Sequence, residues 1–79
     1  MDVTLYSRPN CALCEEAKLM LKLVQEDIAF NFIELNIEDR DEWTEEYGLM
    51  IPVVMVEGEM IQYGQVDYFT LSKRLQKNS

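Results

Sequence analysis

The chain has 79 residues, with 15 acidic and 7 basic side chains and a formal net charge of −8. This length predicts one domain, residues 1–79, and the acidic balance argues against nucleic acid or an anionic membrane as a partner. An apolar content of 48% is typical of a folded domain, not of a disordered chain. No apolar run has the length of a membrane span, and the opening residues lack the pattern of a signal peptide. We therefore expect a cytoplasmic protein, and we expect it to be monomeric.

The first predicted elements are a strand over Val3–Ser7 and a helix that follows it. The strand residues are β-prone and roughly alternating, whereas the apolar residues after them recur at helical spacing. The helix should fade around Glu26 or Asp27. Pro9 cannot continue the preceding ladder, and we expect Asn10 to accept hydrogen bonds from the unpaired N–H groups at the helix start.

The only two cysteines, Cys11 and Cys14, fall at the N-terminal turn of this helix. A thiolate, not a thiol, attacks disulfides, and the N–H groups of a helix N-terminus favour the anion. We therefore expect the pKa of Cys11 to lie below the free value of about 8.5, and Cys14 to be the more buried. Cys11 would attack a disulfide and Cys14 would resolve the mixed disulfide. The structural alternative is two small buried residues at helical spacing.

A second strand is predicted over Ala29–Ile37. Three of its apolar residues should point one way and two phenylalanines the other: Ile33, Leu35 and Ile37 against Phe30 and Phe32. Apolar groups on both faces favour a strand covered by helices on both sides. Because a helix connects the two strands, they should run parallel with a right-handed crossover.

The charged segment Glu38–Tyr47 predicts a short helix that ends at Gly48. Trp43 and Tyr47 are four residues apart, so both would face the sheet and hold the helix on it. The many acids of this segment are expected to form a solvated face.

The last third of the chain predicts a hairpin and a helix. Pro52–Val56 and Glu59–Gln62 read as antiparallel strands joined by a turn at residues 57 and 58. Gly64 then ends the second of these strands, and a final amphipathic helix is predicted over Val66–Lys77. Four of its residues are expected in the core: Val66, Phe69, Leu71 and Leu75.

The predicted order is β-α-β-α-β-β-α, with the cysteine pair after the first strand and a proline opening the third. Together with Ser7-Arg8 through Cys14, Ile51-Pro52-Val53, and Gly64 to Asp67, this order resembles a small glutaredoxin-like member of the thioredoxin superfamily over nearly the whole chain. The resemblance implies an α/β, thioredoxin-like fold with a four-stranded mixed sheet flanked by helices.

The resemblance also implies roles for individual residues. A cis bond between Ile51 and Pro52 would place that loop beside the cysteines, and the backbone of Ile51 would pair with an extended substrate or a glutathione moiety. Arg8 would lie near a glutathione carboxylate, and Gly64 and Asp67 near its other end. Arg8 is equally consistent with a solvated side chain, Gly64 with a turn requirement, and Asp67 with a plain helix N-cap.

The chain departs from the pattern of glutaredoxins and thioredoxins at several of these positions. Ala12 and Leu13 stand between the cysteines, Leu5 occupies the place of the buried strand acid of thioredoxins, and Tyr63 replaces the first of two glycines in glutaredoxins. These features are similar to a short glutaredoxin-like subgroup with a C-x-L-C motif.

The sequence thus predicts a thiol–disulfide oxidoreductase acting on protein or glutathione disulfides. No tightly bound cofactor is expected, and glutathione or a reductase would restore the dithiol. Two alternatives stay open. The first is a metal or iron–sulfur module formed by a dimer, because two thiolates supply half of a four-thiolate site and the chain has no histidine. The second is an adaptor that binds partners in the same groove without turnover.

Overall fold

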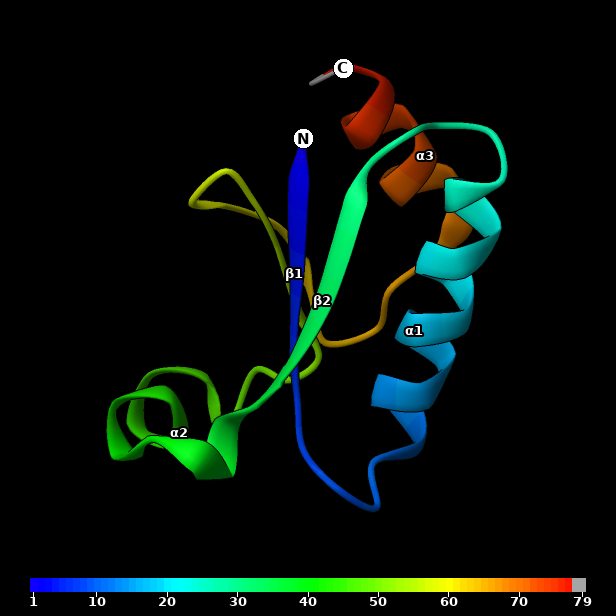
Figure 1. Ribbon diagram of the computed structural model, residues 1–79. Coiled ribbons are helices and arrows are strands. Elements are labelled where there is room, and N and C mark those ends of the chain that lie inside the picture. The colour runs from blue at the N-terminus through cyan, green and yellow to red at the C-terminus, as the bar shows by residue number, and fades with distance from the viewer. Residues whose placement is uncertain (78–79) are drawn as a thin grey trace.

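The computed structural model describes residues 1–77 and contains one mixed four-stranded sheet (Figure 1). The last two residues of the predicted domain lie outside this range. The elements, in chain order, are β1 (Asp2–Ser7), α1 (Ala12–Gln25), β2 (Asn31–Asn36), the 3₁₀ turn η1 (Ile37–Asp39), α2 (Asp41–Tyr47), β3 (Val53–Val56), β4 (Glu59–Tyr63) and α3 (Tyr68–Lys77). The strand order is β2-β1-β3-β4, with β1 parallel to β2 and antiparallel to β3. The predicted fold class is therefore confirmed.

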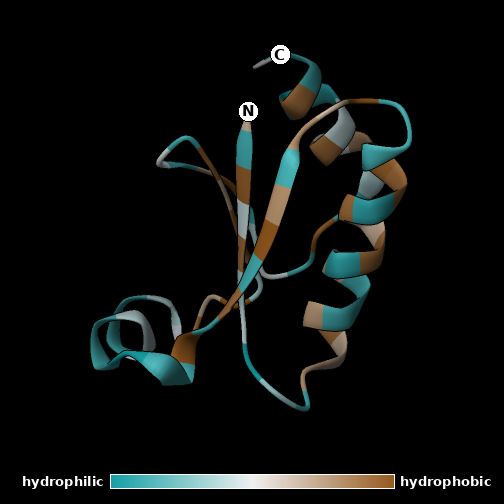
Figure 2. Ribbon diagram, in the orientation of Figure 1, coloured by the Kyte–Doolittle hydropathy of each residue, from teal (hydrophilic) through white to brown (hydrophobic). Residues whose placement is uncertain are grey.

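Helices α1 and α3 cover one face of the sheet, and α2 lies on the other (Figure 1). The larger core forms under α1 and α3, where α1 alternates between hydrophobic and hydrophilic residues as an amphipathic helix does (Figure 2). Its members with at most 1% exposure are Val3, Leu5, Ala17, Leu21, Val24, Val54, Leu71 and Leu75. This core fixes α1, and hence the cysteine pair at its first turn, against the end of β1.

Aromatic contacts hold α2 on the opposite face. The rings of Tyr6 and Tyr47 stack with centroids 4.5 Å apart, and Trp43 meets Tyr6 edge to face at 5.5 Å. The prediction that Trp43 and Tyr47 attach this helix to the sheet is confirmed. The helix ends at Tyr47 with Gly48 as its C-cap, as expected.

The predicted hairpin is present, with β3 and β4 antiparallel. Both residues of its turn have positive φ, 50° at Glu57 and 83° at Gly58. A two-residue turn with this backbone matches the right-handed twist of the strands that it joins.

Two predictions about the core are wrong. Ile33 is 54% exposed because β2 is an edge strand, and the seven-residue α2 packs against Tyr6, Val53 and their neighbours instead of reaching it. Phe69 is 83% exposed. The inward face of α3 is defined by Leu71 and Leu75, and a residue two positions before Leu71 lies on the opposite side of a helix.

Some element boundaries also differ. The second strand begins at Asn31 instead of Ala29, and Ile37 belongs to the 3₁₀ turn. Helix α3 begins at Tyr68, although Val66 is buried ahead of it as predicted. Within residues 1–77, no helix has both the length and the apolar character that crossing a bilayer requires.

Candidate active site

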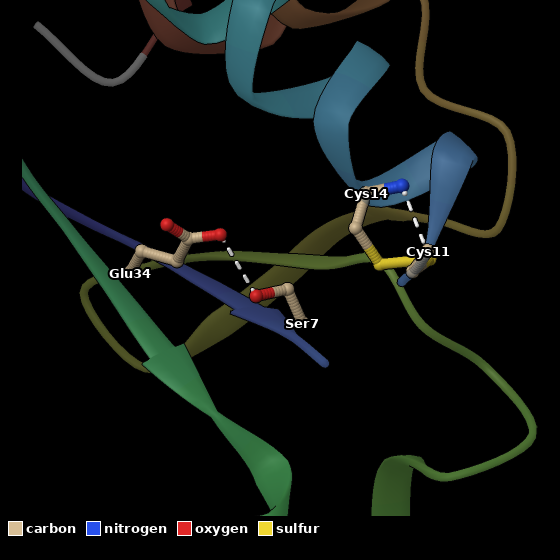
Figure 3. Close-up of a disulfide and its surroundings, with 4 residues drawn as sticks. All are labelled: Ser7, Cys11, Cys14 and Glu34. Atoms are coloured by element: carbon tan, nitrogen blue, oxygen red, sulfur yellow. Dashed lines mark hydrogen bonds between the residues drawn. A yellow bond between two sulfur atoms is a disulfide. The ribbon is translucent and has the colours of Figure 1, made fainter. Parts of the chain in front are cut away.

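Cys11 and Cys14 form a disulfide at the first turn of α1 (Figure 3), with their Cα atoms 5.2 Å apart. Cys11 is the N-cap of the helix, and its sulfur accepts a hydrogen bond from the backbone N–H of Cys14 at 3.2 Å. The expectation that Asn10 caps the helix is therefore wrong. Asn10 instead adopts a φ of 59°, in the left-handed region that asparagine tolerates, and so turns the chain into the helix.

The two cysteines differ in accessibility, as predicted. Cys14 is 1% exposed and lies on the buried face of α1 with Ala17 and Leu21, whereas Cys11 is partly exposed. Of the two residues, Cys11 is therefore the one that another molecule can approach. The same sulfur is the one at the helix N-terminus, where N–H donors favour a negative charge.

The loop before β3 lies beside Cys11. The Ile51–Pro52 peptide bond is cis, Pro52 is buried, and Ile51 is partly exposed. Ile51 lines a hollow of about 480 Å³ together with Arg8, Cys11, Leu13 and other residues of the two loops. A substrate bound at Cys11 would thus contact both loops.

Gly64, the residue after β4, supports this loop and does not line the hollow. Its backbone N–H lies 2.9 Å from the carbonyl oxygen of Pro52 and 3.0 Å from that of Met50. Its φ of 74° lies in the left-handed region, where glycine carries no steric cost. Gly64 therefore lies at a turn whose backbone conformation favours glycine, which is the alternative to ligand contact given above.

Asp67 caps α3. Its Oδ1 accepts the backbone N–H of Thr70 at 2.8 Å, and its Oδ2 accepts the side-chain amide of Gln62 at 2.9 Å. These hydrogen bonds, led by that from Thr70, hold the pKa of Asp67 below its ordinary value. Asp67 does not line the hollow beside Cys11. Its role as an N-cap is confirmed, and contact with a ligand remains a prediction.

A polar network near the disulfide was not predicted. Ser7 is the one polar side chain that is buried among the described residues, and its hydroxyl donates to Glu34 Oε2 at 2.9 Å. The ammonium group of Lys18 lies 3.0 Å from Glu34 Oε1. The three residues come from β1, β2 and α1, so no local sequence signal joins them.

Among residues 1–77, no three cysteine or carboxylate side chains converge as a metal site would require. Among these residues, the two cysteines of one chain therefore have no third ligand side chain grouped with them. A tetrahedral thiolate site would need ligands from elsewhere.

Two solved structures of similar length share the fold and part of the sequence. The X-ray structure of target protein XcR50 from X. campestris is 29% identical, with a TM-score of 0.83 over 95% of this chain and 96% of that chain. The solution structure of protein Ne2328 from Nitrosomonas europaea is 25% identical, with a TM-score of 0.81 over 94% and 89%.

More distant likeness extends to the thioredoxins. Thioredoxin 1 from Thermosipho africanus has a TM-score of 0.62 over 99% of this chain and 98% of that chain, at 9% identity, which is a likeness of fold alone. A family model described as Glutaredoxin-like domain (DUF836) matches residues 2–76. With this match over nearly all of its length, and with a cysteine pair at the helix start of a thioredoxin-like fold, the chain belongs to the family of glutaredoxin-like domains.

Proposed function

We propose that this protein is a thiol–disulfide oxidoreductase that exchanges its Cys11–Cys14 pair with protein or glutathione disulfides. The observation that carries the proposal is the asymmetry of the disulfide. Cys11, the N-cap of α1, is partly exposed, whereas Cys14, three residues further along, is buried. This arrangement gives each cysteine a separate part in a two-step exchange.

In the first step the Cys11 thiolate attacks a substrate disulfide, forms a mixed disulfide and releases one substrate thiolate. In the second step the Cys14 thiolate attacks the Cys11 sulfur, closes the intramolecular disulfide and releases the second thiolate. Two electrons pass to the substrate, and both sulfurs of the pair are oxidised. The described structure corresponds to the end of this sequence.

The hollow beside Cys11 supports a substrate-binding role for the backbone of Ile51 and for Arg8, which both line it. An extended substrate segment would pair with Ile51, and Arg8 would face a carboxylate. Pro52 and Gly64 would act through the shape of the Ile51 loop. Both electrons travel through sulfur, so the chemistry requires no bound cofactor, and glutathione or a reductase in a reducing compartment such as the cytoplasm would restore the dithiol. One chain supplies both cysteines, which is consistent with a monomer.

Two cysteine variants test the proposal. Cys11→Ser should abolish the reduction of a protein disulfide, while Cys14→Ser should retain the first step and accumulate a mixed disulfide that mass spectrometry detects. Turnover that persists in the Cys11→Ser protein would refute the mechanism. A stable complex with a partner protein but no reduction of any disulfide by the wild type would point instead to an adaptor.

A measurement of the redox equilibrium completes the test. Equilibrating the protein in glutathione buffers and counting free thiols after quenching gives the reduction potential of the pair. A two-electron transition near or below the glutathione redox potential of the cytosol, about −220 to −320 mV, would indicate a reductase. Failure to form the intramolecular disulfide at any buffer redox potential would overturn the two-cysteine mechanism.

A further inference from the structure

The hollow beside Cys11 is lined by apolar side chains that face solvent. They are Ala12, Leu13, Leu49 and Ile51. Leu49 is fully exposed, Leu13 is 42% exposed and Ile51 is partly exposed. Single exposed leucines are common on protein surfaces, whereas apolar side chains that gather in one hollow are typical of a binding site. The exchange of disulfides at Cys11 requires none of these side chains, so their place in the hollow calls for another explanation.

The backbone next to Leu49 is held by hydrogen bonds, although its side chain is in water. The N–H of Met50 donates to the carbonyl oxygen of Tyr47 at 2.8 Å, and the carbonyl oxygen of Met50 accepts the N–H of Gly64 at 3.0 Å. Turning Leu49 into the core would break such hydrogen bonds. Its side chain can therefore leave water only when another molecule covers it, and covering apolar surface is favourable.

The charges near the hollow bear on which disulfide it can take. Arg8 is the one charged side chain that lines it among the described residues. Helix α2 lies at the same end of the sheet as the cysteine loop (Figure 1). The segment 38–46, which contains α2, exposes six acids and one base, Arg40: Glu38, Asp39, Asp41, Glu42, Glu45 and Glu46. Each half of glutathione disulfide carries two carboxylates, of which Arg8 can pair with one, so this negative surface disfavours the other. An internal polypeptide segment has no terminal carboxylate.

We propose that the hollow takes a polypeptide segment with a bulky apolar side chain next to the attacked cysteine, and that Leu49 determines this specificity by contacting that side chain. Leu13 and Ile51 would add to the contact, since they line the same hollow. Glutathione has no bulky apolar side chain, so it cannot cover Leu49 in this way. The protein therefore prefers polypeptide disulfides to glutathione disulfide. This inference rests on the proposed function and names its substrate class.

Three small disulfides test the proposal in stopped-flow reactions with the reduced protein. Two are short peptides, capped at both ends, whose central cysteine is joined to nitrothiobenzoate and has either leucine or alanine on both sides. The third is glutathione joined to the same group. The Cys11 thiolate attacks the sulfur of the peptide or glutathione, a new disulfide forms, and the bond to nitrothiobenzoate breaks. The coloured nitrothiobenzoate thiolate leaves with the electron pair, so its absorbance gives the rate constant of the attack.

Each methylene group that leaves water favours binding by about fourfold, so the leucine peptide should react about tenfold faster than the alanine peptide. The glutathione derivative should react no faster than the alanine peptide. Leu49→Ala should lower the ratio between the two peptides to about threefold or less and leave the rate with the alanine peptide within about twofold of the wild type. Leu19→Ala is the matched control, because Leu19 is 58% exposed and does not line the hollow. It should leave the ratio unchanged.

The outcomes separate this inference from the proposed function. Equal rates of the wild type with the two peptides, or a glutathione derivative that reacts as fast as the leucine peptide, would refute the inference alone. So would a ratio that Leu49→Ala leaves unchanged or that Leu19→Ala lowers as much. Equal slowing of both peptides in Leu49→Ala would show a structural effect on Cys11 instead of specificity, and would also count against the inference. Absence of colour from the wild type with all three disulfides would refute the proposed function and this inference together.

Discussion

Leu21 and Leu19 allow a direct test of what fixes the helix that carries the cysteines. Both lie on α1, but the side chain of Leu21 is 0% exposed in the main core and that of Leu19 is 58% exposed. Substitution by alanine removes the same three carbon atoms from the same helix. Any difference in the loss of stability therefore reports burial.

The expected magnitude follows from the structure. Three buried carbons at about 0.8 kcal/mol each give about 2.4 kcal/mol of lost transfer free energy, and the remaining cavity raises losses of this kind to about 2.7–5 kcal/mol. We expect Leu21→Ala to lower the free energy of unfolding by about 3 kcal/mol and Tm by about 12–24 °C. Leu19→Ala should change the free energy by no more than about 0.5 kcal/mol.

Urea unfolding of the oxidised proteins, followed by far-ultraviolet circular dichroism, measures both values. The disulfide stays intact in every sample, so its contribution cancels. Similar slopes against urea would show that the unfolded states are comparable. Equal losses in the two variants would refute the assignment of Leu21 to the core and the argument that this packing holds α1 on the sheet.

Three further predictions concern a backbone position, an ionisable group and an exposed ring. Gly64→Ala should lower the free energy of unfolding by about 1–2 kcal/mol because φ is 74°, and Gly64→Asn should cost less in the same urea assay, since asparagine tolerates this conformation. The folded-state pKa of Glu34 lies below its ordinary value of 4.5, so its ionised form contributes stability above about that pH. The stability lost in Glu34→Gln should therefore shrink as the pH falls below it, and a loss that grows toward acid pH would contradict this sign. Phe69→Ala should leave Tm nearly unchanged, whereas Leu71→Ala should lower it strongly, because only Leu71 is buried.

Much of the fold could be predicted because its signals are local. The helical spacing after Cys11 predicts α1, the residues Glu57-Gly58 predict a two-residue turn, and both are present. The spacing of the two cysteines at a helix start likewise indicates which of them is buried. Such features depend on a few neighbouring residues, so the sequence carries them directly.

The exposure of Ile33 and Phe69 could not be predicted in the same way. An apolar side chain indicates a buried position only if another element covers it, and α2 is too short to cover β2. On α3, the choice of the inward face depends on how the helix is rotated against α1 and the sheet. These are properties of packing between elements that are distant in sequence.

The network of Ser7, Lys18 and Glu34 shows the same division. The sequence by itself determined the cysteine pair, its place at a helix start, the order of the elements and the family that this order resembles. Only the tertiary structure decided that Ser7, Lys18 and Glu34 meet, because their contact requires the parallel pairing of β1 with β2 and the packing of α1 across both. Side chains from three elements converge only after the core has closed, and no periodicity within one segment records where they will meet.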